Sequence, residues 1–286
     1  MSDKLYSAGL VLEGGGMRGL YTAGVLDFFI DKDMYFENCY GVSAGASQCC
    51  SYLSKQKGRA LEINTEYMKD KRYASVSNLI KGGSYFDKEF SLKTIPDELV
   101  LYDYDTFSKS ESNFYAVATD CKTGKPAYLK VEDMSKDLDK VWASCSLPLL
   151  SKMVEIDGEE YLDGGVADAI PVLHALRDGN KKVIVILTRD GDYRKSPEKM
   201  MPLIKLTYHN YPKLVKAMKR RHARYNKTLI KIEKLEKAGK IFVIRPKEIV
   251  EVGRLEKDPE KMKKLYDAGY KDAMDSYEAL CKYLNS

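Results

Sequence analysis

A serine flanked by glycines stands early in the chain, in the segment Gly41-Val42-Ser43-Ala44-Gly45. The pattern Gly-x-Ser-x-Gly is typical of a sharp turn from a strand into a helix, which holds a serine hydroxyl above the sheet where it can act as a nucleophile. Residues 36–40 predict the strand and residues 46–53 the helix, so the Ser43 hydroxyl is expected near the positive end of the helix dipole. A serine that merely caps an ordinary helix would give the same pattern.

A serine nucleophile needs hydrogen-bond donors for the oxyanion that forms during ester cleavage. The run Gly14-Gly15-Gly16-Met17-Arg18-Gly19 can supply them, because consecutive glycines let backbone amides turn toward one point and Arg18 adds a positive charge. The run also fits the Gly-x-Gly-x-x-Gly pattern of dinucleotide-binding folds, in which an acidic residue ends the next strand and binds the ribose. Here that strand ends in Tyr40-Gly41-Val42-Ser43, so nucleotide binding is disfavoured.

The base that activates Ser43 is either a carboxylate or a histidine. Asp163 is followed by Gly164-Gly165, which permit a close approach of the backbone, and partial burial there would make the carboxylate a stronger base. A conventional Ser-His-Asp esterase, built from Ser43, Asp163 and one histidine, is the alternative. Such an enzyme needs several strands before its nucleophile, and only one is predicted between the glycine run and Ser43, so we favour Asp163 as the base. The three histidines are His174, His209 and His222.

The elements that must position these residues follow from the hydrophobic pattern. Apolar runs predict strands at residues 8–12, 36–40 and 182–188, and buried helices at residues 20–30 and 46–53. Two successive strand–helix units predict a parallel sheet. Residues 113–119 and 126–131 flank Lys122-Thr123-Gly124-Lys125 and predict a hairpin. The sheet is expected to end near residue 190.

The last third of the chain predicts helices and carries most of the positive charge. Apolar residues recur at helical spacing over residues 211–237, which predicts a long amphipathic helix, and a strand at 241–245 and a helix at 259–284 are expected after it. We expect residues 6–190 to form the catalytic core and residues 191–286 to be an extension packed on the same domain. Between Arg194 and Lys240, fifteen lysines and arginines stand against three acidic residues, a local net charge of +12 in a chain whose total is +5.

Such a basic segment suits an anionic partner. Nucleic acid is disfavoured because no recognised fold or base-stacking platform accompanies the helix. Two uses stay open: peripheral contact with a membrane surface, and a non-catalytic binding module that uses the basic helix. The apolar stripe of the helix is expected to pack against the core. All residues expected to carry the chemistry lie outside this segment.

The composition limits the class of protein. The chain has 286 residues, of which 44% are hydrophobic, and no apolar run reaches the roughly 18 residues that a membrane span requires. The six cysteines form no Cys-x-x-Cys pattern, so no metal site is expected, and a reduced, cytoplasmic protein is predicted. The N-terminus predicts neither a signal peptide nor an anchor. No cofactor is expected.

The motifs, taken together and in this order, resemble those of the patatin-like phospholipases. Gly14 to Gly19 is similar to the oxyanion-hole motif of that family, and Gly41 to Gly45 to its nucleophile elbow. Ala143-Ser144-Cys145-Ser146-Leu147-Pro148 is similar to the third block of the family, and Asp163-Gly164-Gly165 to its Asp-Gly-Gly/Ala block. The four motifs span residues 8–190, and the extension after them resembles that of bacterial members.

The resemblance implies a three-layer α/β/α fold with a mainly parallel central sheet and a helical C-terminal extension. It also implies a Ser43–Asp163 dyad without histidine, an oxyanion hole at Gly14, Gly15, Gly16 and Arg18, and an acyl-enzyme intermediate. The expected activity is that of a phospholipase or esterase on a lipid or small ester, with peripheral membrane contact as an added expectation. The polar, Tyr-rich residues 58–109 are a candidate lid.

Overall fold

The centre of the fold is an eight-stranded sheet, in a computed structural model that describes residues 4–249 and 251–286. The strand order is β5-β6-β3-β2-β1-β7-β8, and β4 pairs with β3 beside this path. The strands β3, β2, β1, β7 and β8 are parallel, whereas β4, β5 and β6 pair antiparallel to their neighbours. The strands are β1 (Lys4–Leu12), β2 (Met34–Val42), β3 (Asn113–Asp120), β4 (Pro126–Val131), β5 (Val154–Ile156), β6 (Glu159–Asp163), β7 (Val183–Ile186) and β8 (Phe242–Ile244).

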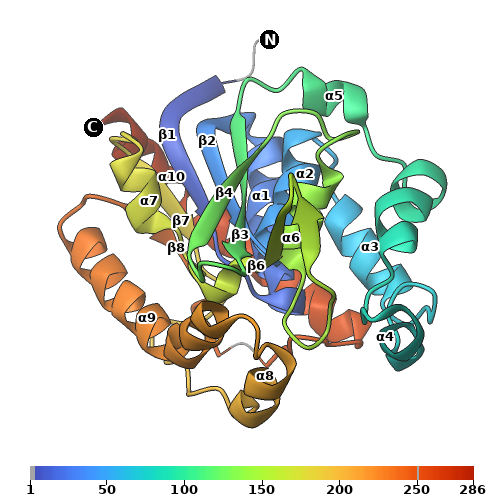
Figure 1. The fold of residues 1–286 in the computed structure, drawn as a ribbon. Helices are drawn as coiled ribbons and strands as arrows, with labels where there is room; N and C mark the ends of the chain where they lie inside the picture. Colours follow the sequence, from blue (N-terminus) through green and yellow to red (C-terminus); the bar gives the residue numbers. More distant parts are fainter. Residues whose placement is uncertain (1–3, 250) are drawn as a thin grey trace.

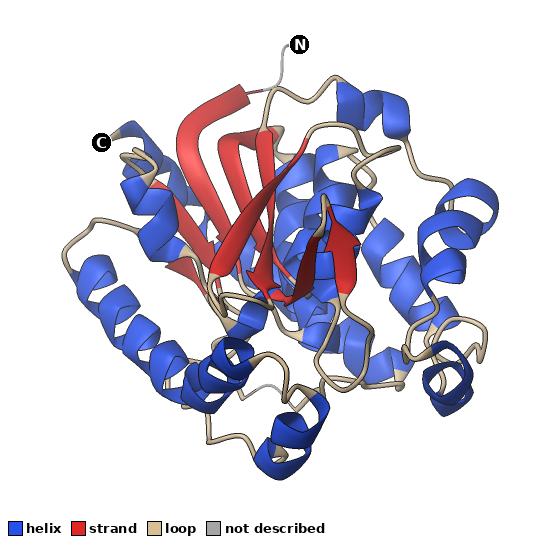
Figure 2. Cartoon of the chain, in the orientation of Figure 1, coloured by secondary structure: helices blue, strands red, loops and turns tan. Residues whose placement is uncertain are grey.

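Helices cover both faces of this sheet, which makes the three-layer α/β/α arrangement that the motifs imply (Figure 1, Figure 2). On one face pack α1 (Gly19–Asp31), α2 (Ala44–Leu53) and α10 (Pro259–Asn285). On the other pack α7 (Val172–Arg177) and α9 (Pro212–Lys237). The remaining helical segments are η1 (Gly16–Arg18), α3 (Arg59–Tyr67), α4 (Val76–Gly82), the π-helical η2 (Phe90–Leu99), α5 (Tyr104–Ser108), α6 (Leu138–Cys145), η3 (Gly164–Val166) and α8 (Met201–Thr207).

The central strands are apolar on both faces because both faces are covered. In β1, Leu10 and Leu12 join the core under α1 and α2, while Val11 between them joins the core under α7 and α9. In β7, Ile184 joins the core under α1 and α2, and Val185 joins the core under α7 and α9. Side chains alternate between the faces of a strand, so a strand buried on both sides reads as a continuous apolar run.

The sequence patterns located the main elements. The strands β1, β2 and β7, the β3–β4 hairpin and the helices α1, α2, α9 and α10 confirm the predicted ones. The expectation that the sheet ends near residue 190 is wrong. The strand β8 pairs in parallel with β7, from Ile184 opposite Phe242 to Ile186 opposite Ile244. A buried strand such as β7 needs a partner for the backbone groups along each of its edges, and β8 satisfies those on the outer edge.

The apolar stripe of α9 packs against the rest of the protein, as predicted. Leu214 and Met218 join a cluster with β6, and Tyr225, Leu229 and Ile232 join the cluster on the outer face of β1 and β7. The stripe is therefore not available to enter a lipid layer. None of the helices in the described ranges is long and apolar enough to cross a bilayer.

Candidate active site

The turn after β2 holds Ser43 in a backbone conformation that few residues other than glycine adopt. Its φ is 53° and its ψ is −123°, which costs a residue with a side chain about 1–3 kcal/mol. The helix α2 begins at once, and its amides at Ala46 and Ser47 donate to the Ser43 carbonyl at 2.9 and 3.1 Å. The chain thus makes a sharp strand-to-helix turn at Ser43.

Two glycines permit this turn. A Cβ on Gly41 would lie 2.5 Å from the Cα of Ala46, and a Cβ on Gly45 would lie 2.6 Å from the carbonyl oxygen of Leu12. Both contacts are with backbone atoms, which have little room to move. A larger residue at either position would push the turn away from the end of β1.

The strand β3 brings the ends of β2 and β6 together. Val117 of β3 pairs with both β2 and β4, and Ala118 pairs with both β4 and β6. The strands β2 and β6 therefore share one edge of β3 and meet with their carboxyl ends facing each other. Val42 is opposite Val117 and Asp163 is opposite Ala118, positions that are about 3.3 Å apart along a strand. Ser43 follows Val42 directly, so the chain reaches Ser43 next to Asp163.

The end of α6 is hydrogen-bonded to both sides of this junction. The Ser144 hydroxyl accepts from the Ser43 amide at 2.9 Å and donates to the Val117 carbonyl at 2.6 Å. Two residues later, the Ser146 carbonyl accepts from the Asp163 amide at 2.8 Å. Ser144 is fully buried. In the sequence, this block stands out only through its resemblance to a family motif. Its hydrogen bonds to the Ser43 turn and to Asp163 are evident only in three dimensions.

Asp163 is buried, and its two carboxylate oxygens have different surroundings. Oδ1 accepts from the Gly165 amide at 2.8 Å. Oδ2 has no hydrogen-bond partner within the described residues. Such an unpaired carboxylate oxygen is rare in the interior of a folded protein. A Cβ on Gly164 would lie 2.0 Å from the Val117 carbonyl oxygen, so only glycine fits beside β3 at this position.

The glycine run after β1 lies against Ser43. A Cβ on Gly14 would be 3.1 Å from the Ser43 Cβ. Gly16 has a φ of +60°, and a Cβ there would be 2.5 Å from the Arg254 carbonyl oxygen. Across the described ranges, no acceptor binds the amides of Gly14, Gly15 or Gly16. Backbone donors are therefore available beside the serine.

The buried Glu13 and the half-buried Arg18 determine the position and the charge of this loop. The Glu13 carboxylate accepts from the Thr188 amide at 2.6 Å and from the Tyr225 hydroxyl of α9 at 2.5 Å. Arg18 is half-buried, and its Nε has no partner among the described residues. Burial, followed by the positive charges of Arg189 and Arg254, lowers the pKa of Arg18 to about 10. The loop thus carries a cation that still has hydrogen-bonding capacity.

The basic helix α9 contacts the loop that follows Asp163. Arg221 Nε donates to the Gly165 carbonyl at 2.6 Å. Arg224 donates to the carbonyls of Val166 and Ala167 at 3.0 and 2.7 Å. Burial lowers the pKa of Arg221, and the negative charge of Asp163 opposes that effect. Two arginines of α9 therefore hold the loop that follows Asp163.

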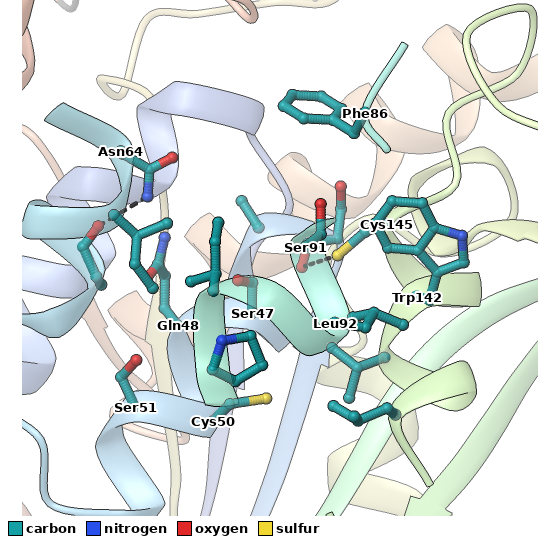
Figure 3. A pocket seen from close by; sticks show the side chains of 18 of the residues that line it. Ser47, Gln48, Cys50, Ser51, Asn64, Phe86, Ser91, Leu92, Trp142 and Cys145 are labelled. Atoms are coloured by element: carbon teal, nitrogen blue, oxygen red, sulfur yellow. Dashed lines mark hydrogen bonds between the residues drawn. The ribbon is translucent and has the colours of Figure 1, made fainter. Parts of the chain in front are cut away.

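A pocket opens beside Ser43, with an empty volume of about 1300 Å³ including its mouth (Figure 3). Residues 58–109, the candidate lid, supply one wall, and α2 and α6 supply others. Figure 3 looks into the pocket, with Asn64 of α3 on one side and Trp142 of α6 on the other. Its apolar and aromatic lining includes Ile63, Phe86, Leu92, Ile95, Pro96, Val141, Trp142 and Leu147. Such a lining fits a hydrocarbon chain.

Comparisons with known proteins identify the family of the chain. A family model described as patatin-like phospholipase matches residues 10–176, more than half of the chain. The chain belongs to the patatin-like phospholipase family. A second model, a domain of unknown function (DUF6363), matches residues 211–285, which include α9 and α10.

Among patatin-like relatives, the uncharacterized protein YjjU of Escherichia coli (strain K12) is 30% identical over 218 residues, which are 70% of this chain and 60% of that protein. The chain thus spans less than two thirds of that relative. A protein of Invertebrate iridescent virus 6, named probable lipid hydrolase 463L, is 24% identical over 68% of this chain and 74% of its own. The crystal structure of VipD from Legionella pneumophila aligns with 95% of this chain and 67% of its own, at a TM-score of 0.45 and 11% identity.

The histidines of this patatin-like chain make their contacts elsewhere. His174 stacks on Tyr128, with ring centres 3.4 Å apart, and His209 Nδ1 contacts the Leu206 carbonyl. His222 Nδ1 is buried without a hydrogen-bond partner in the described part of the chain. None of the three is hydrogen-bonded to Ser43 or Asp163 there. Nor do three His, Cys, Asp or Glu side chains of the described residues converge where a metal ion could bind.

Proposed function

We propose that the chain is a lipid acyl hydrolase, a phospholipase or esterase that cleaves carboxylic esters through a Ser43–Asp163 dyad. The observation that supports this most is the junction on β3, where the turn bearing Ser43 meets Asp163. The Asp163 carboxylate is buried, and only its Oδ1 has a hydrogen-bond donor among the described residues. Family membership supports an ester-hydrolysing activity directed at lipids, and one relative is named a probable lipid hydrolase. The apolar pocket beside Ser43 supports a substrate with a hydrocarbon chain.

In the first half-reaction, Asp163 Oδ2 takes the proton of the Ser43 hydroxyl while Oγ attacks the ester carbonyl carbon. The amides of the Gly14 to Gly16 loop, with Arg18 beside them, stabilise the negative charge on the tetrahedral oxygen. The intermediate then collapses and the alcohol leaves with the proton held by Asp163. The product is an acyl ester on Ser43.

In the second half-reaction, a water molecule attacks this acyl ester. Asp163 removes a proton from the water and returns it to Ser43 Oγ as the carboxylic acid leaves. The acyl chain lies in the pocket through both steps. Because each buried CH₂ group contributes about 0.8 kcal/mol, a long chain supplies much of the binding energy.

Labelling and hydrolysis together test the dyad. A fluorophosphonate probe should label Ser43, identified by mass spectrometry of the peptide. Ser43→Ala and Asp163→Asn should reduce hydrolysis of p-nitrophenyl butyrate to background while the circular dichroism spectrum stays native, and replacement of the exposed Ser108 by alanine is the control. Turnover retained by either variant, or label on another residue, would reject the dyad. Replacing all three histidines should change turnover little, and its collapse would favour a Ser-His-Asp triad.

We also propose a peripheral contact with a lipid surface, made by α8 and the turn before it. Met200, Leu203 and Leu206 are exposed by 49%, 41% and 73%, and Lys199 and Lys205 are exposed among them. Exposed apolar side chains with flanking lysines suit an anionic membrane interface. Wild-type protein should sediment with vesicles that contain phosphatidylglycerol at low salt, and the Leu203→Ser/Leu206→Ser variant should sediment less. Absence of wild-type binding at low salt would reject this contact.

A further inference from the structure

Five cationic side chains lie close enough for their charges to interact, although they come from distant parts of the sequence. One belongs to the glycine-rich loop beside Ser43, one follows β7, one precedes α8, one lies on α9 and one follows β8. All are half-buried. They are Arg18, Arg189, Lys195, Arg221 and Arg254.

Arg254 is the member of this group that lines the pocket containing Ser43. Its carbonyl oxygen accepts from the Met17 amide at 3.2 Å, which ties the segment after β8 to η1. Its Cγ lies 2.7 Å from the point that a Cβ of Gly16 would occupy, and Arg254 lines the same pocket as Ser43. Arg254 therefore lies against the glycine-rich loop, in the wall of the pocket that contains Ser43.

Lys195 is connected to the same loop through Tyr225 and Glu13. Its ammonium is 4.8 Å from the centre of the Tyr225 ring, a distance suited to a cation–π contact. The Tyr225 hydroxyl in turn binds Glu13, the residue before the glycine run. Arg18 completes the group, because its Cβ is 3.2 Å from the point that a Cβ of Gly15 would occupy.

Within the described residues, the nearby carboxylates form no ion pair with three of these cations, Arg18, Lys195 and Arg254. Glu13, Asp163 and Glu198 are the acidic residues whose charge reaches the cluster. Glu13 is already hydrogen-bonded to Thr188 and Tyr225. In the described ranges, none of the three comes within ion-pair distance of Arg18, Lys195 or Arg254.

The cations therefore repel one another in a half-buried setting. Burial, and then the charges of Arg221 and Arg254, lower the pKa of Lys195 to about 8. Gathering like charges in this way weakens the folded state, and such groups cluster at functional sites. An anion bound among them would remove the repulsion.

We propose that Arg18, Lys195 and Arg254 bind the phosphate group of the substrate lipid, beside the ester that Ser43 attacks. Guanidinium groups pair with phosphate through two parallel hydrogen bonds, and a lysine adds a compact charge. Arg254 lines the same pocket as Ser43 and the apolar side chains, so a phosphate at one end of the substrate and an acyl chain at the other would both be accommodated. This proposal rests on the proposed lipid acyl hydrolase function.

Binding is tested first with the Ser43→Ala protein, which needs no turnover. Calorimetric titration with dihexanoyl phosphatidylglycerol should give about tenfold weaker binding after Lys195→Gln or Arg254→Gln, as expected for loss of a charge-assisted hydrogen bond. Lys216→Gln, an exposed lysine elsewhere on α9, is the matched control and should leave the Kd unchanged. Lys195→Arg should keep the binding. The site would be overturned if Ser43→Ala and Ser43→Ala/Lys195→Gln bound the lipid with equal Kd values. It would also be overturned if Lys216→Gln weakened the binding as much as Lys195→Gln.

Inorganic phosphate distinguishes the source of the anion. It should bind at the same residues at least about tenfold more weakly than the lipid, because it lacks the acyl chains. Phosphate that binds as tightly as the lipid would overturn the assignment to a lipid headgroup.

Hydrolysis separates failure of this site from failure of the proposed function. For the enzyme with Ser43 intact, the ratio of kcat/KM on dihexanoyl phosphatidylglycerol to that on uncharged dihexanoylglycerol should fall about tenfold in Lys195→Gln and Arg254→Gln. An unchanged ratio with active enzyme would reject the phosphate site alone. Specific binding of the lipid without hydrolysis of any ester would reject the enzymatic function while the phosphate site stands.

Discussion

Replacing Ser144 by alanine tests whether the Ser43 turn is held from outside its own motif. The buried Ser144 hydroxyl binds the Ser43 amide and the Val117 carbonyl, at 2.9 and 2.6 Å. Its removal leaves a buried donor and a buried acceptor unpaired, at about 1–3 kcal/mol each. The free energy of unfolding should therefore fall by roughly 2–6 kcal/mol, which lowers the Tm of a domain this large by roughly 4–24 °C.

The same substitution should reduce turnover. The Ser43 amide is one of the contacts that keep the residue at a φ of 53°, and its release lets the turn relax toward an unstrained conformation. A displacement of the nucleophile by about 1 Å costs on the order of 100-fold in rate. We expect kcat on p-nitrophenyl butyrate to fall about 10- to 100-fold, with little change in KM because the pocket walls are intact.

Ser146→Ala is the matched control. Ser146 is also buried, but its hydroxyl donates only to the Trp142 carbonyl one turn earlier, and its contact with Asp163 is made by the backbone. Urea unfolding followed by circular dichroism should show a loss below about 1 kcal/mol, with near wild-type kcat. The reasoning is refuted if Ser144→Ala matches the wild type in both measurements, or if the two alanine variants lose the same amount.

Three further predictions concern the loop, the pocket and the cationic cluster. Gly16→Ala should lower kcat about 100-fold, the usual effect of losing one oxyanion donor. Gly82→Ala, where a Cβ meets open space, is the control and should retain activity. Equal activities of the two variants would show that the loop conformation is unimportant. The kcat/KM on p-nitrophenyl esters should rise up to about fourfold for each CH₂ added to the acyl chain, until the pocket is full. Leu92 lines the pocket, so Leu92→Trp should end that rise at a shorter acyl chain. A kcat/KM that does not change with chain length would exclude the pocket as the acyl site. Burial and neighbouring arginines lower the pKa of Lys195 from 10.5 to about 8, so the folded state holds this proton less tightly than the unfolded chain does. The free energy of unfolding should therefore gain a contribution as pH rises from about 8 to 10, and a wild-type increase no larger than that of Lys195→Met in urea titrations would contradict it.

Much of the fold was predictable from the sequence because its determinants are local. Continuous apolar runs identify β1 and β7, since a strand covered on both faces has no polar side. The helical spacing of apolar residues identifies α9 and the face it buries. The strand β8 was predicted as an element but not as part of the sheet, because pairing with β7 depends on a partner more than fifty residues away.

The candidate site, too, was predictable from the sequence only where its determinants are local. The motif around Ser43 predicts a sharp turn because its small residues are required by steric contacts within a few residues, as at Gly41 and Ala46. The function of Ser144 had no such local signal, because its two partners lie 101 and 27 residues away. Its place in a recurring block was the only indication in the sequence.

What the sequence by itself determined about this protein is therefore the set of its strands and helices, the strained turn at Ser43 and the family it resembles. These depend on backbone sterics and on the periodic burial of side chains, which act over a few residues. Only the tertiary structure decided that Asp163 ends β6 opposite Ala118, one position beyond the partner of Val42, that arginines of the basic helix hold the loop after Asp163, and that the charges of Lys195 and Arg254 interact. The register of β3 and the mutual repulsion of charges arise between segments far apart in the chain, and the sequence carries no local record of them.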